Sequence, residues 1–263
     1  MRNPSRVIVV SLAAAALACA RDDFPVGRIV DLSHSYAADT IYWPSDTRGF
    51  EYETLAAGRT DGGYYYQAGR FSTAEHGGTH LDAPVHFAEG RPAVDAIDLA
   101  RLLGPAIVVD VTAACAADPD YGVRIQDLLD FEKAHGRIPD GTIVLLRTGW
   151  AARWGDRARY LGTTQTGDEA LLGLHFPGLD PDAARWLAEQ RRAGAVGLDT
   201  PSIDHGPSKD FQSHRILLGH GIPVFENLAS LDGLPEDGFS LVALPMKIAG
   251  GSGAPLRAVA IVP

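Results

Sequence analysis

The sequence predicts an α/β fold, organised as a single compact domain around a mixed sheet. Short apolar runs typical of strands alternate along the chain with segments that have the apolar spacing of helices. The 263 residues are 46% hydrophobic, which is enough to form a full core. The sequence shows no internal repeat, low-complexity tract or long linker. Its 29 glycines and 17 prolines are spread through the connections, which leaves room for a site built on loops.

The expected strands are of two kinds. Some are rich in aromatic and β-branched residues, as in RIVDLSH and YYYQAGRFSTAE. Others, such as AIVVDV and TIVLLRT, are continuous apolar runs typical of buried strands. In chain order we expect strands at 28–34, 64–75, 106–111, 142–148, 195–200, 222–227, 240–248 and 257–263.

Two segments have the pattern of helices. Residues 124–136 carry apolar side chains at four helically spaced positions and end at Gly136, a residue type that commonly closes a helix. Residues 180–194 begin with an aspartate before a proline and end at Gly194. The alternation of these helices with the strands supports the α/β assignment.

The first twenty residues are expected to be an export signal. Arg2 and Arg6 precede an apolar run of thirteen residues that is short for a membrane span but typical of a signal-peptide core. Cleavage after Ala20 and lipid modification at Cys19 both fit the sequence, and an uncleaved anchor helix is the alternative. We therefore expect an exported protein, periplasmic or lipid-anchored at the cell envelope, with residues 21–263 as its functional domain.

Charge and cysteine content exclude several classes of protein. Lys and Arg total 23 against 33 Asp and Glu, a net charge of −10. A negative net charge argues against binding to nucleic acid and to an anionic membrane surface, because both are themselves negatively charged. Membrane contact is therefore expected only through an N-terminal lipid. Cys115 is the single cysteine after the predicted signal. It can form no internal disulfide, and we expect it to be structural.

The stretch HGGTHLDAPVHF, residues 76–87, holds three of the nine histidines and an aspartate. Its two adjacent glycines make a helix costly, so we expect a tight loop that bends around an ion. His76, His80 and Asp82 would supply two imidazoles and a carboxylate, a usual donor set for Zn²⁺ or Mn²⁺. Histidines with satisfied hydrogen bonds in the core or on the surface are the alternative.

Two further donors appear late in the chain, in SHRILLGHGIPVFENL. His214 and Glu226 are twelve residues apart, and each alone is a weak signal. A carboxylate in an apolar strand is expensive to bury without a partner, and a metal ion is one such partner. A salt bridge to Glu226, or backbone hydrogen bonds to its carboxylate, are the alternatives to a metal ion.

The stretch HGGTHLDAPVHF resembles the H-x-G-T-H-x-D-x-P-x-H-F signature of the cyclase-like metal-dependent hydrolases, which include bacterial kynurenine formamidase and isatin hydrolase. DLSHSY, GLDTPSID and LPMKIAGGSGAPLRAVAIV resemble other blocks of the family, and YWPSD resembles its W-P-G-D turn, with Ser45 replacing glycine. The resemblance covers nearly all of the chain after the signal. It implies a swivelling β/β/α domain and an oligomer, a homodimer or homotetramer.

The resemblance also implies the roles of individual residues. Asp82 would bridge two divalent ions, for which Zn²⁺ is favoured and Mn²⁺ is the alternative. His86 matches the family's catalytic histidine, which is not a stable ligand. Glu226 separates the chain from the isatin-hydrolase branch, which is similar at the C-terminus but uses one metal. The implied metal ligands are His76, His80, Asp82, His214 and Glu226.

The activity implied is hydrolysis of an amide bond in a small molecule by a metal-activated water, with His86 supplying a proton to the leaving amine. An aryl formamide is the favoured substrate, and a lactam or cyclic imide is the next. An exported protein that binds a metal or solute without catalysis is the alternative from another class. Tryptophan catabolism is the role that the resemblance implies. Kynurenine formamidases of this type are normally cytoplasmic, so the expected export signal argues against that role but not against the hydrolytic chemistry.

Aromatic residues are expected to line a pocket for a flat substrate, with core packing as the alternative. The candidates are Tyr42, Trp43, Tyr64, Tyr65, Tyr66 and Phe211. His34 is expected either to orient a ligand or to be structural. His135, in the last turn of its helix, is expected to be structural.

Overall fold

A computed structural model describes residues 26–263, so the predicted export signal lies outside the described residues. The main sheet has eight strands in the order β1-β12-β11-β5-β7-β9-β10-β4, and β12 also pairs with β4. Seven strands therefore close into a ring, and β1 pairs with β12 beside it. The strands are β1 (Arg28–Asp31), β4 (His80–Asp82), β5 (Leu103–Asp110), β7 (Ile143–Arg147), β9 (Ala195–Leu198), β10 (Val224–Glu226), β11 (Phe239–Pro245) and β12 (Gly253–Val262).

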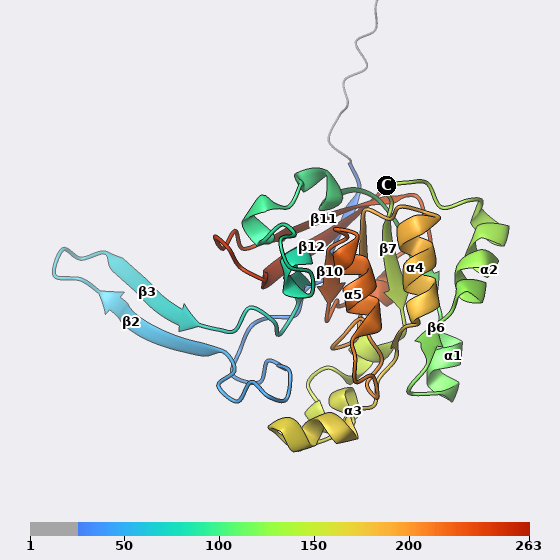
Figure 1. Ribbon diagram of the computed structural model, residues 1–263. Coiled ribbons are helices and arrows are strands. Elements are labelled where there is room, and N and C mark those ends of the chain that lie inside the picture. The colour runs from blue at the N-terminus through green and yellow to red at the C-terminus, as the bar shows by residue number, and fades with distance from the viewer. Residues whose placement is uncertain (1–25) are drawn as a thin grey trace, which may run out of the picture.

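The sheet is mixed, as the sequence predicts. Strands β5, β7, β9 and β10 are parallel, and the remaining pairings are antiparallel. Helices α2, α4 and α5 cover the parallel part of the sheet, whereas α3 lies away from it (Figure 1). The helices are α1 (Thr112–Ala117), α2 (Ile125–His135), α3 (Arg157–Leu161), α4 (Pro181–Glu189) and α5 (Gln212–Gly219).

Two apolar cores lie on opposite faces of the parallel strands. On β7, Val144 and Leu146 pack under the helices with Leu187 and Leu217. Leu145, between them, points into the ring, because successive side chains of a strand alternate between the two faces. The ring interior is filled by apolar side chains that include Leu81, Leu145, Phe225, Leu241 and Ala258.

A long hairpin leaves the body of the molecule (Figure 1). Its strands, β2 (Glu51–Arg59) and β3 (Tyr65–Ser72), pair only with each other and form a separate two-stranded sheet. The remaining elements are short. Strand β6 (Gly122–Val123) pairs with β8 (Gly178–Leu179), and short 3₁₀ helices occur at Pro84–His86, Val94–Ala96, Leu99–Arg101, Trp150–Arg153, Asp168–Gly173 and Leu231–Gly233.

Several predicted elements differ in extent from the structure. The helix expected at 124–136 is present as α2, and Gly136 closes it with a φ of 90°. The helix expected at 180–194 ends at Glu189, because Arg192 adopts the left-handed conformation and turns the chain toward β9. The tight loop expected around His80 is instead a strand, β4, that follows a bend at the two glycines.

Among the helices of residues 26–263, none is both long and apolar enough to cross a membrane.

Candidate metal centre and active site

Strands β4 and β10 bring three polar side chains to one face of the sheet. His80 and Asp82 are two residues apart on β4, so they share a face while Leu81 points into the ring. Glu226 on β10 is the direct antiparallel partner of His80. All three side chains are at least 95% buried, and they point away from the ring interior.

Helix α5 adds His214 from the side of the sheet that the helices cover. The N-terminus of this helix has no local side-chain cap; instead, the Asp204 carboxylate accepts the backbone N–H groups of Ser213 and His214. The same carboxylate lies 2.6 Å from the His214 Nδ1. One residue from the loop that precedes α5 therefore fixes both the start of the helix and the orientation of the imidazole.

His76 approaches from the bend that precedes β4. The backbone can make this bend because Gly77 has no Cβ: an added Cβ would lie 2.1 Å from the Tyr42 ring. Gly78 follows with a φ of 58°, a conformation that L side chains rarely adopt. The two glycines thus allow His76 and His80 to converge on Asp82, which explains why they occur between these histidines.

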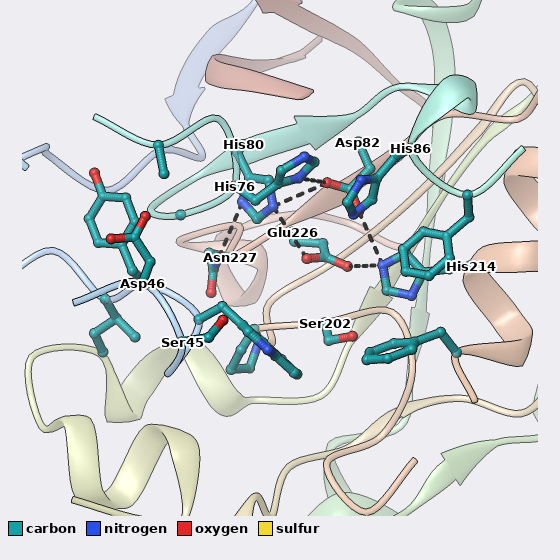
Figure 2. A pocket seen from close by; sticks show the side chains of 18 residues that line it. Ser45, Asp46, His76, His80, Asp82, His86, Ser202, His214, Glu226 and Asn227 are labelled. Carbon is teal, nitrogen blue, oxygen red and sulfur yellow. Dashed lines mark hydrogen bonds and ion pairs between the residues drawn. The ribbon is translucent and has the colours of Figure 1, made fainter. Parts of the chain in front are cut away.

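The five donors meet around Asp82 (Figure 2). Its Oδ1 lies 2.7 Å from His76 Nδ1 and 3.2 Å from His80 Nε2, while its Oδ2 lies 3.1 Å from His214 Nε2. Glu226 closes the arrangement, with Oε1 3.1 Å from His214 Nε2 and Oε2 3.4 Å from His80 Nε2. The donors form two groups, His76–His80–Asp82 and Asp82–His214–Glu226, each compact enough to hold one ion.

Each imidazole is oriented by a hydrogen bond on its outer nitrogen. His80 Nδ1 lies 3.0 Å from the Gly78 carbonyl oxygen, which can only accept, so this nitrogen carries the proton. The Asp204 carboxylate fixes His214 in the same way. In both rings the lone pair of Nε2 then faces the cluster. Hydrogen bonds of this type set the tautomer of metal-binding histidines.

His76 is held through a longer chain of contacts. Its Nε2 lies 2.9 Å from the Ser252 hydroxyl, which in turn donates to the Glu75 carboxylate. The serine oxygen is therefore free to accept the His76 Nε2 proton, which leaves Nδ1 to face Asp82. Three imidazoles and two carboxylates with their lone pairs turned to a common centre are a donor set that fits a divalent ion such as Zn²⁺ or Mn²⁺.

The charges of the cluster also favour a cation. Burial alone raises the pKa of Asp82, but the neighbouring imidazoles, His76 first, outweigh it and hold this pKa well below its usual range. Burial lowers the pKa of His80, but Asp82 and Glu226 outweigh it and raise this pKa to about 10. Burial also lowers the pKa of His214, but the hydrogen bonds to Asp204 and Asp82 outweigh it and raise this pKa. The two buried carboxylates, Asp82 and Glu226, therefore need positive charge beside them. A divalent ion would supply it without protonation of the histidines.

His86 lies beside the cluster but outside both donor groups. It ends the 3₁₀ turn Pro84–His86, and its ring stacks on His76 at a centroid distance of 3.9 Å. Burial lowers the pKa of His86 to about 4, an effect that Asp82 opposes. The side chain lines the pocket above the donors, where it can reach a bound molecule.

The pocket over the cluster has a volume of about 360 Å³ and is mostly apolar. Three of the predicted aromatic residues, Tyr42, Trp43 and Phe211, line it. Phe87, which the sequence did not single out, joins them: its ring lies 5.4 Å from that of Phe211 and 4.8 Å from that of His214. This aromatic lining is suited to a flat ring held next to the donors.

The prediction that the other three aromatic candidates line the pocket is wrong. Tyr64, Tyr65 and Tyr66 lie at and beside the turn of the β2–β3 hairpin and are all more than 50% exposed. They are absent from the pocket lining, because the hairpin carries them away from the body. A tyrosine-rich stretch alone does not show whether its side chains face a cavity or solvent.

His34 and His135 are placed away from the donors. The His34 ring stacks on Trp154 at 3.9 Å, and burial lowers its pKa to about 4. Its backbone N–H, not its ring, supports the motif, by donating to the Thr79 hydroxyl. His135 lies between Glu236 and Asp237 at the end of α2, where its two ring nitrogens contact these carboxylates.

Comparison with known proteins shows the family of the chain. A family model named Cyclase, described as "Putative cyclase", matches residues 30–205. An isatin hydrolase of Roseibium aggregatum is 36% identical over 197 residues, which are 72% of each protein. A kynurenine formamidase of Salinibacter ruber is 32% identical over 237 residues, which are 88% of this chain and 96% of that protein.

Solved structures agree with the sequence relatives. Isatin hydrolase A from Ralstonia solanacearum superposes with a TM-score of 0.81 at 32% identity, covering 90% of this chain and 92% of that one. An isatin hydrolase bound to the product analogue thioisatinate gives a TM-score of 0.81 at 30% identity, covering 89% and 92%. The expected fold is thereby confirmed, and the chain belongs to the cyclase family of hydrolases.

Proposed function

We propose that the protein hydrolyses an amide bond in a small molecule, with a divalent metal centre held by the five buried donors. The observation that carries this proposal is the convergence of two donor groups on Asp82, with His86 beside them at the pocket. A protein that only bound a metal would have no use for an imidazole next to the donors that is not one of them. The alternative of a non-catalytic binding protein is therefore less favoured.

The donor set supports two ions, one in each group, with Asp82 shared between them. His76, His80 and Asp82 would hold the first, and Asp82, His214 and Glu226 the second. Nitrogen and carboxylate donors suit Zn²⁺ best, and Mn²⁺ is the alternative. Bound there, such an ion polarises a carbonyl group and lowers the pKa of water to near 7.

The side chains of the chain itself supply position and proton transfer. Trp43, Phe87 and Phe211 hold a flat ring and exclude water from the pocket. His86 can accept a proton from the attacking water and return it to the nitrogen as the carbon–nitrogen bond breaks. Tyr42 closes the wall of the pocket, since its hydroxyl is hydrogen-bonded to Thr73 and its ring packs over Gly77.

The substrate we favour is an aryl formamide. The kynurenine formamidase from Salinibacter ruber, which matches over almost its whole length, supports this choice. The second candidate is a lactam or cyclic imide, and the similarity to isatin hydrolases in sequence and in structure supports it. Both substrates contain a planar amide, which would lie next to the same five metal-binding side chains. Both are small enough for a pocket of about 360 Å³.

We also propose that the protein acts outside the cytoplasm as a domain of residues 21–263. The N-terminal pattern of residues 1–20 supports export, either to the periplasm or to the envelope through a lipid on Cys19. Cell fractionation of the wild type and of Cys19→Ser separates the two cases. A lipid-anchored protein would move from the membrane fraction to the soluble fraction in the variant, whereas a soluble periplasmic protein would not change.

The experiment that tests the activity is a substrate panel combined with metal analysis. The purified protein is loaded with Zn²⁺ or Mn²⁺, and hydrolysis of an N-formyl anilide, a fused lactam such as isatin and a cyclic imide is measured. Turnover of one class above the metal-free protein is expected. Full metal content with no turnover of any class would contradict the proposal.

His86→Ala tests the role given to the histidine beside the cluster. We expect turnover to fall by about 10²- to 10⁴-fold, the usual contribution of a general acid or base, while metal content stays near that of the wild type. His220→Ala, at an exposed position at the end of α5, is the control and should change neither quantity. Loss of metal along with activity would make His86 a ligand and would overturn this assignment.

A further inference from the structure

Ser202 is a buried side chain in the wall of the pocket, on the loop between β9 and α5. It is 3% exposed and lines the pocket together with the five donors. Its Oγ accepts the backbone N–H of Asp204 at 3.2 Å, and this is the only hydrogen bond of the hydroxyl group within residues 26–263. The hydroxyl proton therefore has no acceptor in the described part of the chain, although the side chain borders the pocket.

The loop holds Ser202 next to the metal-binding side chains. Pro201 restricts the backbone on one side of it, and the Thr200 hydroxyl donates to the Ser202 carbonyl oxygen at 2.9 Å. On the other side, the backbone N–H of Ile203 donates to Glu226 Oε1 at 2.7 Å. The backbone of Ser202 is therefore fixed beside Glu226, at the edge of the donor set (Figure 2).

The other buried polar side chains of the pocket wall already have partners. Apart from the five donors, these are Tyr42 and Asn227, each 3% exposed. The Tyr42 hydroxyl is hydrogen-bonded to a threonine outside the pocket lining. The Asn227 amide donates to the Gly78 carbonyl oxygen at 2.7 Å and accepts from the Tyr160 hydroxyl at 2.8 Å. Among these buried groups of the described chain, Ser202 is thus the one left to contact a bound molecule.

We propose that Ser202 donates its proton to a second carbonyl group of the substrate, attached to the aromatic carbon next to the one that bears the amide nitrogen. In the proposed function, on which this assignment rests, the amide itself lies at the five donors. The substrate class is then aryl amides with an ortho carbonyl, which includes ortho-acyl formanilides and fused lactams such as isatin. Ser202 determines specificity, because it contacts a part of the substrate that takes no part in bond cleavage.

The lining of the pocket explains why the proton needs an acceptor from the substrate. Much of the lining is aromatic, from Trp43, Phe87 and Phe211. A flat ring that fills this space displaces the water that would otherwise solvate the hydroxyl, and a buried donor without an acceptor is costly. Unsubstituted formanilide has one carbonyl group, which belongs to the amide, so it leaves the hydroxyl unpaired. A substrate with a second carbonyl restores the hydrogen bond, and polar sites discriminate on this basis.

The position of Ser202 determines where the second carbonyl must lie. Its neighbour in the sequence, Ile203, contacts the donor Glu226, so the hydroxyl is close to the place of the amide. The ortho carbon is the ring position nearest to the carbon that bears the nitrogen. A para carbonyl lies at the far end of the ring, so it cannot reach the same hydroxyl while the amide stays at the donors.

The test compares the ortho-acetyl and para-acetyl isomers of formanilide on the metal-loaded protein. The isomers have the same atoms, and in both the carbonyl is conjugated with the nitrogen, so they differ mainly in where the carbonyl lies. The kcat/KM of each isomer is measured with the wild type, Ser202→Ala and Ser208→Ala. Calorimetry with the same proteins measures binding of the two acetylanilines that hydrolysis would release, which needs no turnover. Metal analysis checks that each variant is loaded.

Ser202→Ala should lower kcat/KM for the ortho isomer about 2- to 10-fold more than for the para isomer, the usual effect of one neutral hydrogen bond. The affinity for the ortho acetylaniline should fall by the same factor relative to its para isomer. Ser208→Ala is the matched control, because the Ser208 hydroxyl also reaches Asp204 but does not line the pocket. It should keep the wild-type ratio for both pairs of compounds.

Other outcomes overturn the assignment. An equal loss for both isomers in Ser202→Ala would mean that the serine acts only through Asp204 or the fold. A preference for the ortho compounds that survives in Ser202→Ala would give the second carbonyl to another residue. In both cases hydrolysis of the isomers would leave the proposed function intact. Binding that favours the ortho acetylaniline and depends on Ser202, without hydrolysis of either formanilide, would support the serine contact and contradict the proposed function.

Discussion

At the scale of single residues, the cluster depends on side chains that do not belong to it. Asp204 holds the outer nitrogen of His214 and caps the helix that carries it. Burial raises the pKa of Asp204, but His214 outweighs it and leaves this pKa lowered, so the carboxylate stays charged. A neutral amide in its place could still fill the space, but it would hold the imidazole less strongly and would not fix the same tautomer.

Asp204→Asn is expected to weaken metal binding by about 10- to 100-fold, the usual effect of losing the partner of a metal-binding histidine. The measurement is competition of the purified protein with a chromophoric chelator for Zn²⁺, which reads metal affinity directly. Asp180→Asn is the matched control, because Asp180 also caps a helix but contacts none of the five donors. Equal metal affinity in the wild type and Asp204→Asn would show that Asp204 only caps α5.

The sequence predicted which residues form the cluster but not the residues that orient them. Four of the six residues proposed for metal binding and catalysis lie within one contiguous motif, so their proximity follows from their short spacing in the sequence. His214 and Glu226 could be assigned only by resemblance, since nothing local shows that α5 and β10 face β4. Ser252 is 176 residues from His76, and its role depends on the pairing of β12 with β4. No pattern in a single sequence shows such a contact.

At the scale of elements, the end of α2 is tied to the segment after α4 by one ion pair. The Glu132 carboxylate accepts two hydrogen bonds from the Arg191 guanidinium, at 2.6 and 2.7 Å, and one from the backbone of Ile138. The same guanidinium lies over the Trp186 ring. This geometry is bidentate and mostly shielded from water, so it contributes more than an ordinary surface pair.

Glu132→Gln should lower the free energy of unfolding by about 1 to 2 kcal/mol at pH 7. The Arg191 hydrogen bonds lower the pKa of Glu132 in the folded state, so the stabilisation is present above the unfolded pKa and is lost as the pH falls through the folded pKa. The difference between wild type and variant should therefore shrink below about pH 4. Urea denaturation at several pH values measures it, with the exposed Glu169→Gln as control. A difference that stays constant with pH would exclude the ion pair as its source.

Two elements that the sequence missed, α5 and β2, lack the local signals on which prediction depends. Phe211, the residue before helix α5, is in the left-handed conformation, and the N–H groups of the helix are capped by Asp204, so the residues next to the helix carry no start signal. Strand β2 is exposed on both faces, and a strand without a buried face shows no alternation of apolar and polar residues. The buried strands, by contrast, were predictable because burial on both faces requires continuous apolar runs.

At the scale of the whole molecule, the ring is held by side chains that fill its interior. Phe225 is among the largest of the fully buried side chains, and it lies on β10 between Val224 and the donor Glu226. Gly197 on the neighbouring β9 leaves space for it, since a Cβ there would lie 3.2 Å from that of Phe225. The position of Glu226 therefore depends on packing on the opposite face of its own strand.

Phe225→Ala is expected to lower the free energy of unfolding by about 3 to 5 kcal/mol, because it removes a large buried ring and leaves a cavity. Leu172→Ala, at a side chain that is 80% exposed, should change it by less than about 0.5 kcal/mol. Chemical denaturation measures both. A loss of less than about 1 kcal/mol in Phe225→Ala would mean that the ring interior collapses around the gap and is not rigidly packed.

Closure of the ring by β12 has a consequence for the order in which the chain can fold. The strand Gly253–Val262 pairs with β1, β11 and β4, and two of these partners lie far from it in the sequence. Until β12 is in place, β4, which carries His80 and Asp82, lacks one of its two neighbours. The cluster is therefore completed only when a pairing of long sequence separation has formed, and such pairings are slow to form.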